Sequence, residues 1–258
     1  MAVGAARAAG ARERVQNPYS RLPNWLYPTF VAAALTVFGL YALWVVFFQT
    51  RGYAAPYLSP FYSPYLWVGG PIPSAIWVAW APFAFRTTCY YYRKAYFRSF
   101  FLHPRSCAVP EPERPGPFHR YRGETVFPYV LNNLHRFALY ATMVQVGFLW
   151  YDVFFAFRFG SHWGVGVGTA LMLVNVLLLS GYTFGCHALR HLSGGGMDCF
   201  SCSQAARARF KLWKGVTVLN VSHDRWAWAS LASVWAVDIY VRLMMHGALA
   251  DPRWVPFS

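Results

Sequence analysis

Thiol and imidazole side chains are concentrated in one short stretch, SGYTFGCHALRHLSGGGMDCFSC, which runs from Ser180 to Cys202. This stretch holds three of the five cysteines and two of the eight histidines of the chain. Cysteine thiolates and histidine imidazoles are the side chains that hold zinc, iron–sulfur clusters and haem. Because the stretch begins where a long apolar run ends, it is either a metal or redox centre at a membrane surface or only the end of an apolar helix.

More thiols and imidazoles lie near the ends of other apolar runs, so several elements must meet to form a site. A Rieske-type [2Fe-2S] cluster takes two thiolates and two imidazoles. The candidate thiolates are Cys89, Cys107 and Cys186, and the candidate imidazoles are His135, His187, His191 and His223. The usual Cys-x-His and Cys-x-x-His spacings of soluble Rieske proteins are absent. A haem is the alternative, since His135 with His191 or His223 supplies two axial imidazoles.

The pair Cys199 and Cys202 forms a CxxC motif, which is typical of a zinc half-site or a redox dithiol. No second CxxC exists in the sequence to complete a four-thiolate site. The pair also follows three consecutive glycines. We therefore do not assign a metal to it.

The composition indicates a membrane protein. The chain of 258 residues is 57% hydrophobic and only 12% charged, whereas a soluble domain is about one quarter charged. The net charge of +14 does not predict a nucleic-acid partner, because the basic residues flank apolar runs instead of forming one stripe. An odd number of cysteines makes a disulfide framework unexpected, and we expect free thiols.

Five apolar runs are long enough to cross a bilayer, which needs roughly 20 helical residues. They are about 26–48, 71–92, 126–157, 163–187 and 224–246. We therefore predict an all-α integral membrane bundle of five transmembrane helices. The second run is the weakest, because Pro82 and Arg86 interrupt it.

The distribution of Lys and Arg predicts the orientation of the bundle. The N-terminal tail and the connections 86–125 and 188–222 carry most of the basic residues, which belong on the cytoplasmic side. Residues 1–25 are then a cytoplasmic tail, 26–246 the membrane domain, and 247–258 a tail on the outer side. All five cysteines fall at the inner side, in a reducing compartment. The Pro- and Tyr-rich outer connection 49–70 is expected to lie along the interface.

Ionisable side chains inside the spans are costly in lipid and suggest function or pairing. Asp238 and Arg242 are four residues apart and are expected to pair on one helix face, while Asp152 is expected to reach outer water. At the inner side, donors beside an apolar cleft suit the two carbonyls of a quinone. The quinone candidates are Arg86, Tyr90, His135 and Arg136.

Three blocks, RTTCYYYRKAYFRSFFLHPRSCAVPEP, YRGETVFPYVLNNLHRFALY and GCHALRH, resemble a known family. This family is the single-chain, five-helix membrane anchor of succinate dehydrogenase found in mycobacteria and other bacteria, and the likeness runs from about Tyr19 to Met245. Relatives often read Cys-His-x-Cys-Arg-His at the last block, where this chain has Ala188 and Leu189. A second thiol there is therefore not essential in this chain.

The resemblance implies a non-catalytic anchor in the bacterial cytoplasmic membrane. Its partners would be the flavoprotein and iron–sulfur subunits of succinate dehydrogenase, with a possible small extra membrane subunit. A Rieske-type [2Fe-2S] cluster and menaquinone or ubiquinone are the implied cofactors. Our preferred ligands are Cys89 and Cys186 with two of His187, His191 and His223, and Cys107 is the alternative thiolate. The other hypotheses are a haem b anchor without a cluster and a non-redox membrane scaffold or transporter.

Overall fold

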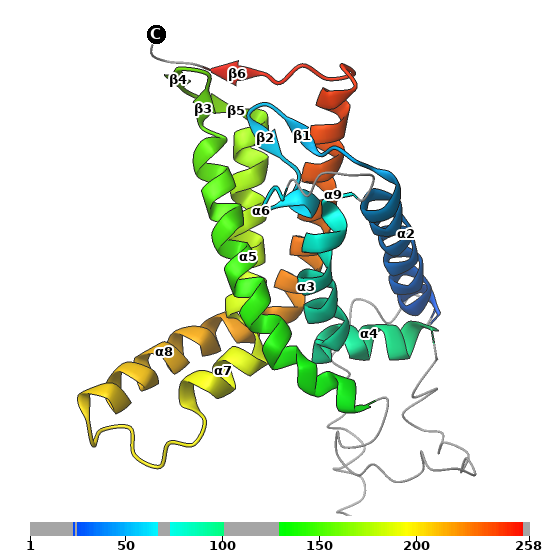
Figure 1. The fold of residues 1–258 in the computed structure, drawn as a ribbon. Helices are drawn as coiled ribbons and strands as arrows, with labels where there is room; N and C mark the ends of the chain where they lie inside the picture. Colours follow the sequence, from blue (N-terminus) through cyan, green and yellow to red (C-terminus); the bar gives the residue numbers. More distant parts are fainter. Residues whose placement is uncertain (1–22, 24, 67–72, 101–128, 255–258) are drawn as a thin grey trace, which may run out of the picture.

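The structure, a computed structural model, describes residues 23, 25–66, 73–100 and 129–254 of the chain. Long helices lie side by side in a bundle, with short strands at one end and helices that cross the bundle direction at the other (Figure 1). The α-helices are α2 (Leu26–Phe48), α3 (Ala75–Thr88), α4 (Tyr90–Phe100), α5 (His135–Phe155), α6 (Val167–Phe184), α7 (His187–Gly194), α8 (Gln204–Val221) and α9 (His223–Met245). Two 3₁₀ turns, η2 (Pro60–Tyr62) and η4 (Tyr129–Leu134), complete the helical part.

Three two-stranded antiparallel ladders add to the helices, so the described fold is mostly rather than entirely helical. The strand β1 (Tyr53–Ala54) pairs with β2 (Tyr57–Leu58), β3 (Arg158–Phe159) with β4 (His162–Trp163), and β5 (Val165–Gly166) with β6 (Arg253–Trp254). The last ladder joins the start of α6 to the segment that follows α9. The three ladders lie together at one end of the bundle (Figure 1).

Three helical segments within the described residues are long and apolar enough to cross a membrane, namely Leu26–Phe48, Val130–Phe155 and Val167–Phe184. The other two expected spans differ from these. Helix α3 has only 14 residues, and the 23-residue α9 includes Asp224, Arg225, Asp238 and Arg242. Crossing by all five helices, and the orientation of the chain, therefore stay predictions.

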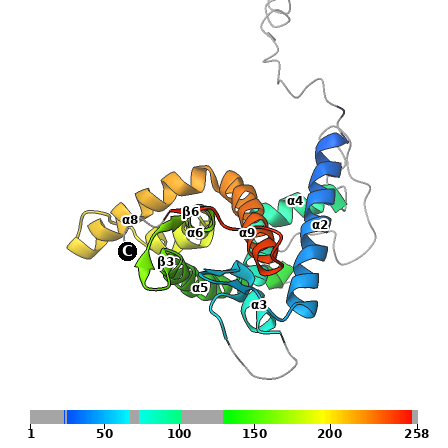
Figure 2. The same cartoon turned by 90° about the horizontal axis from the view of Figure 1, so that it is seen from above.

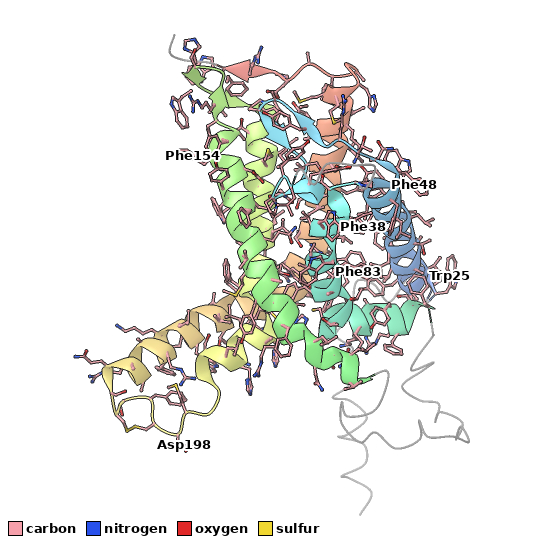
Figure 3. The ribbon with its side chains drawn as sticks, in the orientation of Figure 1. Trp25, Phe38, Phe48, Phe83, Phe154 and Asp198 are labelled. Atoms are coloured by element: carbon pink, nitrogen blue, oxygen red, sulfur yellow. A yellow bond between two sulfur atoms is a disulfide. The ribbon has the colours of Figure 1, made fainter. Side chains whose placement is uncertain are left out.

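The outer surface of the bundle is suited to lipid. Large apolar side chains point away from the helices, among them Phe48, Phe83 and Phe154, which are 75%, 69% and 57% exposed (Figure 3). Helix α2 has only two buried residues, Val31 and Val45, although it is apolar throughout. Apolar surface of this extent would be unfavourable in water but is expected where acyl chains are the solvent.

Two expected spans are interrupted at cysteines. The second run ends its helix at Thr88, and Cys89 has an extended backbone before α4 begins in a new direction. Helix α6 likewise ends at Phe184, and Cys186 has an extended backbone before α7. The side chain of Asn220 donates to the Gly185 carbonyl (2.7 Å) and so satisfies a carbonyl freed by this break.

The connection 188–222, expected to be an inner loop, contains the 18-residue helix α8. The hydroxyl of Ser203 accepts a hydrogen bond from the Ala206 amide (3.0 Å) and caps its first turn. Arg209 donates to the carbonyls of Ser193 and Gly195 at the end of α7. Helices α7 and α8 therefore form one arm, which extends sideways from the bundle (Figures 1 and 2).

The connection 49–66, expected on the outer side, packs into the bundle instead of lying along its surface. Tyr57, Tyr62, Ser59 and Ser63 are each 0% exposed. The Ser63 hydroxyl donates to Asp152, which is half-buried, so this carboxylate also bonds within the protein. The proline- and tyrosine-rich composition of this connection therefore reflects a packed turn.

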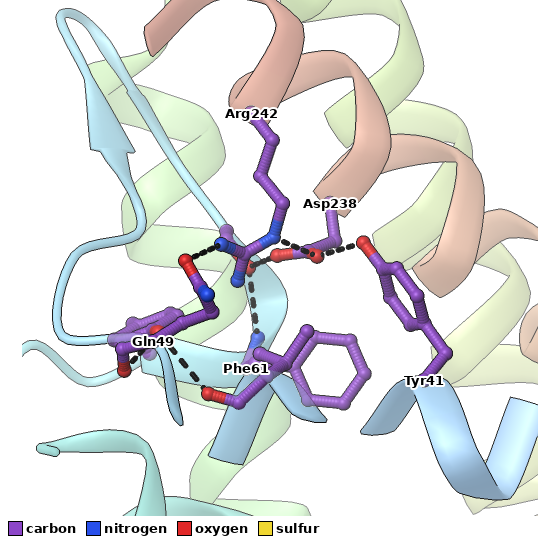
Figure 4. Close-up of polar contacts among 8 residues, drawn as sticks. Tyr41, Gln49, Phe61, Asp238 and Arg242 are labelled. Atoms are coloured by element: carbon purple, nitrogen blue, oxygen red, sulfur yellow. Dashed lines mark hydrogen bonds and ion pairs between the residues drawn. The ribbon is translucent and has the colours of Figure 1, made fainter. Parts of the chain in front are cut away.

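The predicted pair of Asp238 and Arg242 is confirmed. The Arg242 Nε donates to Asp238 Oδ2 (2.7 Å). Asp238 is 0% exposed and Arg242 is 6% exposed. Tyr41 from α2 and Ser59 also donate to Asp238, while Arg242 Nη1 contacts Gln49 Oε1 at 3.2 Å (Figure 4). One carboxylate therefore connects α9, α2 and the connection that follows α2.

We expect Asp238→Ala to destabilise the fold strongly, because it leaves Arg242 buried without a counter-charge. Breaking a buried ion pair on one side costs about 3–5 kcal/mol. The midpoint of thermal unfolding of the purified protein in mild detergent measures the effect. Asp198→Ala, at an exposed position on the arm, is the matched control and should leave the midpoint nearly unchanged. Equal midpoints for the two variants would contradict a stabilising role.

Candidate functional site

A cleft of about 990 Å³ lies at the end of the bundle where α4 and α7 begin. The two helix breaks, the start of α5 and the start of α9 all contribute to its lining. The thiols and imidazoles along it are Cys89, His135, Cys186, His187, His191 and His223. Six of the sequence candidates for ligation are thus brought to one cleft, and Cys107 lies outside the described residues.

The first thiol, Cys89, lies between α3 and α4 and is 2% exposed. Its Sγ is 3.6 Å from Nε2 of His223, the first residue of α9. The other ring nitrogen of His223, Nδ1, is buried without a hydrogen-bond partner in the described part of the chain. Helix α4 begins immediately after Cys89, so this sulfur lies at the start of a helix.

The second thiol, Cys186, has the same position relative to α6 and α7 and is 1% exposed. Its Sγ accepts a hydrogen bond from the Ala188 amide (3.3 Å) and lies 3.1 Å from Nε2 of His135. Binding of a metal requires the thiolate form of cysteine, so a bound metal would displace the proton of this sulfur.

A hydrogen bond at Nδ1 fixes the orientation of the His135 ring. The Thr88 hydroxyl donates to the Ala84 carbonyl (2.6 Å), so it must accept from His135 Nδ1, which is 2.9 Å away. This leaves the lone pair of Nε2 facing Cys186. The ring is also stacked on Phe85, with 4.6 Å between centroids. A histidine that is held through Nδ1 and directs Nε2 at a thiol has the arrangement of a metal ligand.

The remaining two histidines of the cleft are more exposed. His187 follows Cys186 directly and lines the cleft, and His191 Nδ1 contacts Arg136 Nη2 at 3.1 Å. Within the described residues, no three His, Cys, Asp or Glu side chains converge as a ready group for one metal ion. The site instead consists of two thiol–imidazole pairs on the same cleft.

The CxxC pair is not part of this cleft. Cys199 and Cys202 form a disulfide between α7 and α8 on the arm, so the expectation of free thiols is wrong for this pair. Cys89 and Cys186 are free and buried. Cys199 and Cys202 are close enough to bond because the chain bends just before Ser203.

The quinone candidates separate into two groups. Tyr90, His135 and Arg136 line the cleft. Arg86 does not; it is directed into the bundle, where it donates to the Tyr92 hydroxyl and to Ser230 Oγ (3.0 Å). Its guanidinium lies 4.7 Å from the centroid of the Tyr182 ring.

Several polar residues of the site were not singled out from the sequence. Asn132, Asn133 and Asn220 line the cleft together with Arg93. A smaller hollow of about 210 Å³ adjoins it and is lined by Arg93, Tyr96 and Phe97 among others. The spacing of Arg93, Tyr96 and Phe97 places them on one helix face, a signal that becomes informative once α4 is known to be a separate helix.

Comparisons with known proteins agree on one family. The family model described as actinobacterial succinate dehydrogenase subunit SdhC matches residues 26–247. A chain in the solved structure of the Mycobacterium smegmatis Sdh1 complex in the apo form is 35% identical with a TM-score of 0.77. The match covers 95% of this chain and 98% of that chain. A search of curated protein sequences found no significant match.

The matched range includes both helix breaks, the cleft and the Asp238–Arg242 pair, and both findings extend over most of the chain. The chain therefore belongs to the actinobacterial SdhC family and is a membrane-anchor subunit of a succinate dehydrogenase complex.

Proposed function

We propose that this anchor holds a Rieske-type [2Fe-2S] cluster in the cleft and passes electrons from the soluble subunits to a quinone. The observation that carries the proposal is the meeting of two buried thiols and their imidazole partners on one cleft. Cys89 and Cys186 would supply the thiolates. Two of His135, His187 and His223 would supply the imidazoles, and the exposed His191, which contacts Arg136, is less suited.

The donor set fits such a cluster in kind and number. A Rieske cluster takes two thiolates on one iron and two imidazoles on the other, so no group of three ligands around one ion is required. In the structure each thiol lies against an imidazole, and binding requires these side chains to regroup within the cleft. His135 directs Nε2 at the Cys186 sulfur, and Nδ1 of His223 is buried without a hydrogen-bond partner among the described residues. Both features are consistent with a site for a metal.

When bound, the cluster accepts and releases one electron at a time. The flavoprotein that oxidises succinate and the iron–sulfur subunit would dock on the basic inner face, beside the cleft. Helix α4 contributes Arg93, Lys94 and Arg98 to that face. A small extra membrane subunit is a further possible partner. The whole complex would lie in the bacterial cytoplasmic membrane with the cleft toward the cytoplasm.

The same cleft is where we place the quinone, menaquinone or ubiquinone. Arg136 and Tyr90 would donate to a quinone carbonyl, since a quinone needs donors at its head and an apolar surround for its ring. The half-exposed aromatic residues of α4 provide that surround. Arg86 is withdrawn from this role, because its hydrogen bonds are made inside the bundle.

We expect the purified complex, after reduction, to give an EPR signal of low average g-value that disappears in Cys89→Ser and in Cys186→Ser. Serine keeps the size of the side chain but binds iron poorly compared with thiolate. The matched control is Cys202→Ser, which removes one sulfur of the Cys199–Cys202 disulfide outside the cleft and should leave the signal unchanged.

Two results would overturn this assignment. A complex without the low-g signal, whose iron is fully accounted for by the soluble subunits, would support a non-redox anchor. A low-spin ferric haem signal that persists in Cys186→Ser would assign the site to a haem held by the histidines.

For the quinone we expect Arg136→Gln to raise the KM for quinone about tenfold, because a hydrogen bond to a charged group contributes about 1.5–3 kcal/mol. Succinate oxidation with a soluble dye as acceptor should be unchanged, since that reaction does not use the cleft. Arg158→Gln, in the β3–β4 hairpin at the other end of the bundle, is the control. An unaltered KM in Arg136→Gln would remove Arg136 from the quinone site.

A further inference from the structure

The hydroxyl of Tyr182 is a buried polar group without a partner. Tyr182 is 1% exposed, and its hydroxyl has no hydrogen bond to any described residue. A buried hydroxyl that loses its contacts with water and gains none is unfavourable by about 1–3 kcal/mol. Such groups are rare in folded proteins and usually indicate a partner that the bare chain lacks.

The ring of Tyr182 is held in place on several sides. It stacks on His223, with 4.9 Å between centroids and 13° between planes. The Phe85 and Tyr92 rings pack edge-on against it at 5.3 and 5.9 Å. The Arg86 guanidinium lies over it. With so many contacts the hydroxyl cannot turn to solvent.

Cys89 belongs to the same buried cluster as Tyr182. His223, on which the Tyr182 ring stacks, has its Nε2 3.6 Å from the Cys89 sulfur, so this thiol lies beside the tyrosine. A neutral thiol is a weak hydrogen-bond acceptor, whereas a metal-bound thiolate carries negative charge and accepts strongly. The hydroxyl would therefore gain its partner at the moment Cys89 binds iron.

We propose that Tyr182 donates a hydrogen bond to the sulfur of Cys89 when Cys89 is a cluster ligand, and that this bond raises the reduction potential of the cluster. The inference rests on the proposed function, because it requires a cluster at Cys89. Hydrogen bonds to ligand sulfurs are among the factors that set cluster potentials. Reduction adds one electron and hence negative charge, so a donor at the sulfur favours the reduced form. Tyr182 is thus a positioning and tuning residue, not a ligand.

The test is a redox titration of the purified complex followed by EPR, comparing wild type with Tyr182→Phe. Phenylalanine keeps the stacked ring and removes only the hydroxyl. We expect the same cluster content, nearly the same g-values and a midpoint potential shifted downward. The control is Tyr62→Phe, which removes another fully buried hydroxyl, one bonded to the Gln49 carbonyl (2.8 Å) away from the cleft. That control should leave the potential unchanged.

A second variant keeps the test decisive if Tyr182→Phe fails to assemble. A trifluorotyrosine introduced at position 182 retains the hydroxyl but makes it a stronger donor, so the potential should shift upward. An unchanged potential in either assembled variant overturns the inference. A wild-type complex without a low-g cluster signal would instead contradict the proposed function. Failure of the inference about Tyr182 is therefore distinguishable from failure of the proposed function.

Discussion

The need to satisfy backbone polar groups inside an apolar bundle is the constraint on which this structure depends. An apolar helix can end inside such a surround only where side chains or other segments bond its free carbonyls and amides. Here two helices end near one level of the bundle, at Thr88 and at Phe184. The Thr88 hydroxyl and the Asn220 side chain bond carbonyls beside the breaks. Cys89 follows the first helix end directly and Cys186 follows the second after Gly185, so the two cysteines lie near the same level.

This arrangement explains why the two thiols are buried although each lies where the chain changes direction between two helices. Each cysteine precedes a helix, so its sulfur lies near free amides, as the contact of Cys186 with the Ala188 amide shows. The chain then leaves the bundle as α4 on one side and as α7 on the other (Figure 1). The starts of α5 and α9 fill the space between, and they bring His135 and His223 against the two sulfurs.

The other end of the bundle is organised around polar contacts rather than thiols. Asp238 receives hydrogen bonds from Tyr41, Ser59 and Arg242 (Figure 4). Asp251 accepts from the Gly168 amide (3.0 Å) near the start of α6 and from Tyr240. These carboxylates bind segments that are distant in sequence. The bundle is thereby held at one end, while the helix ends at the other enclose the cleft.

By itself the sequence determined the apolar helices, the pairing of Asp238 with Arg242 and the gathering of Cys89 and Cys186 with four histidines at one end of the bundle. Each of these follows from local periodicity or from composition, which depend only on neighbouring residues. Only the tertiary structure decided that 71–92 is broken at Cys89, that α8 is a helix, and that His135 and His223 are the imidazoles in contact with the thiols. A helix break depends on whether distant groups such as Asn220 satisfy the freed carbonyls. The choice of histidine depends on how four helix ends rotate against one another. Residue spacing along the sequence predicts neither the helix breaks nor the histidines that contact the thiols, because both depend on contacts between residues far apart in sequence.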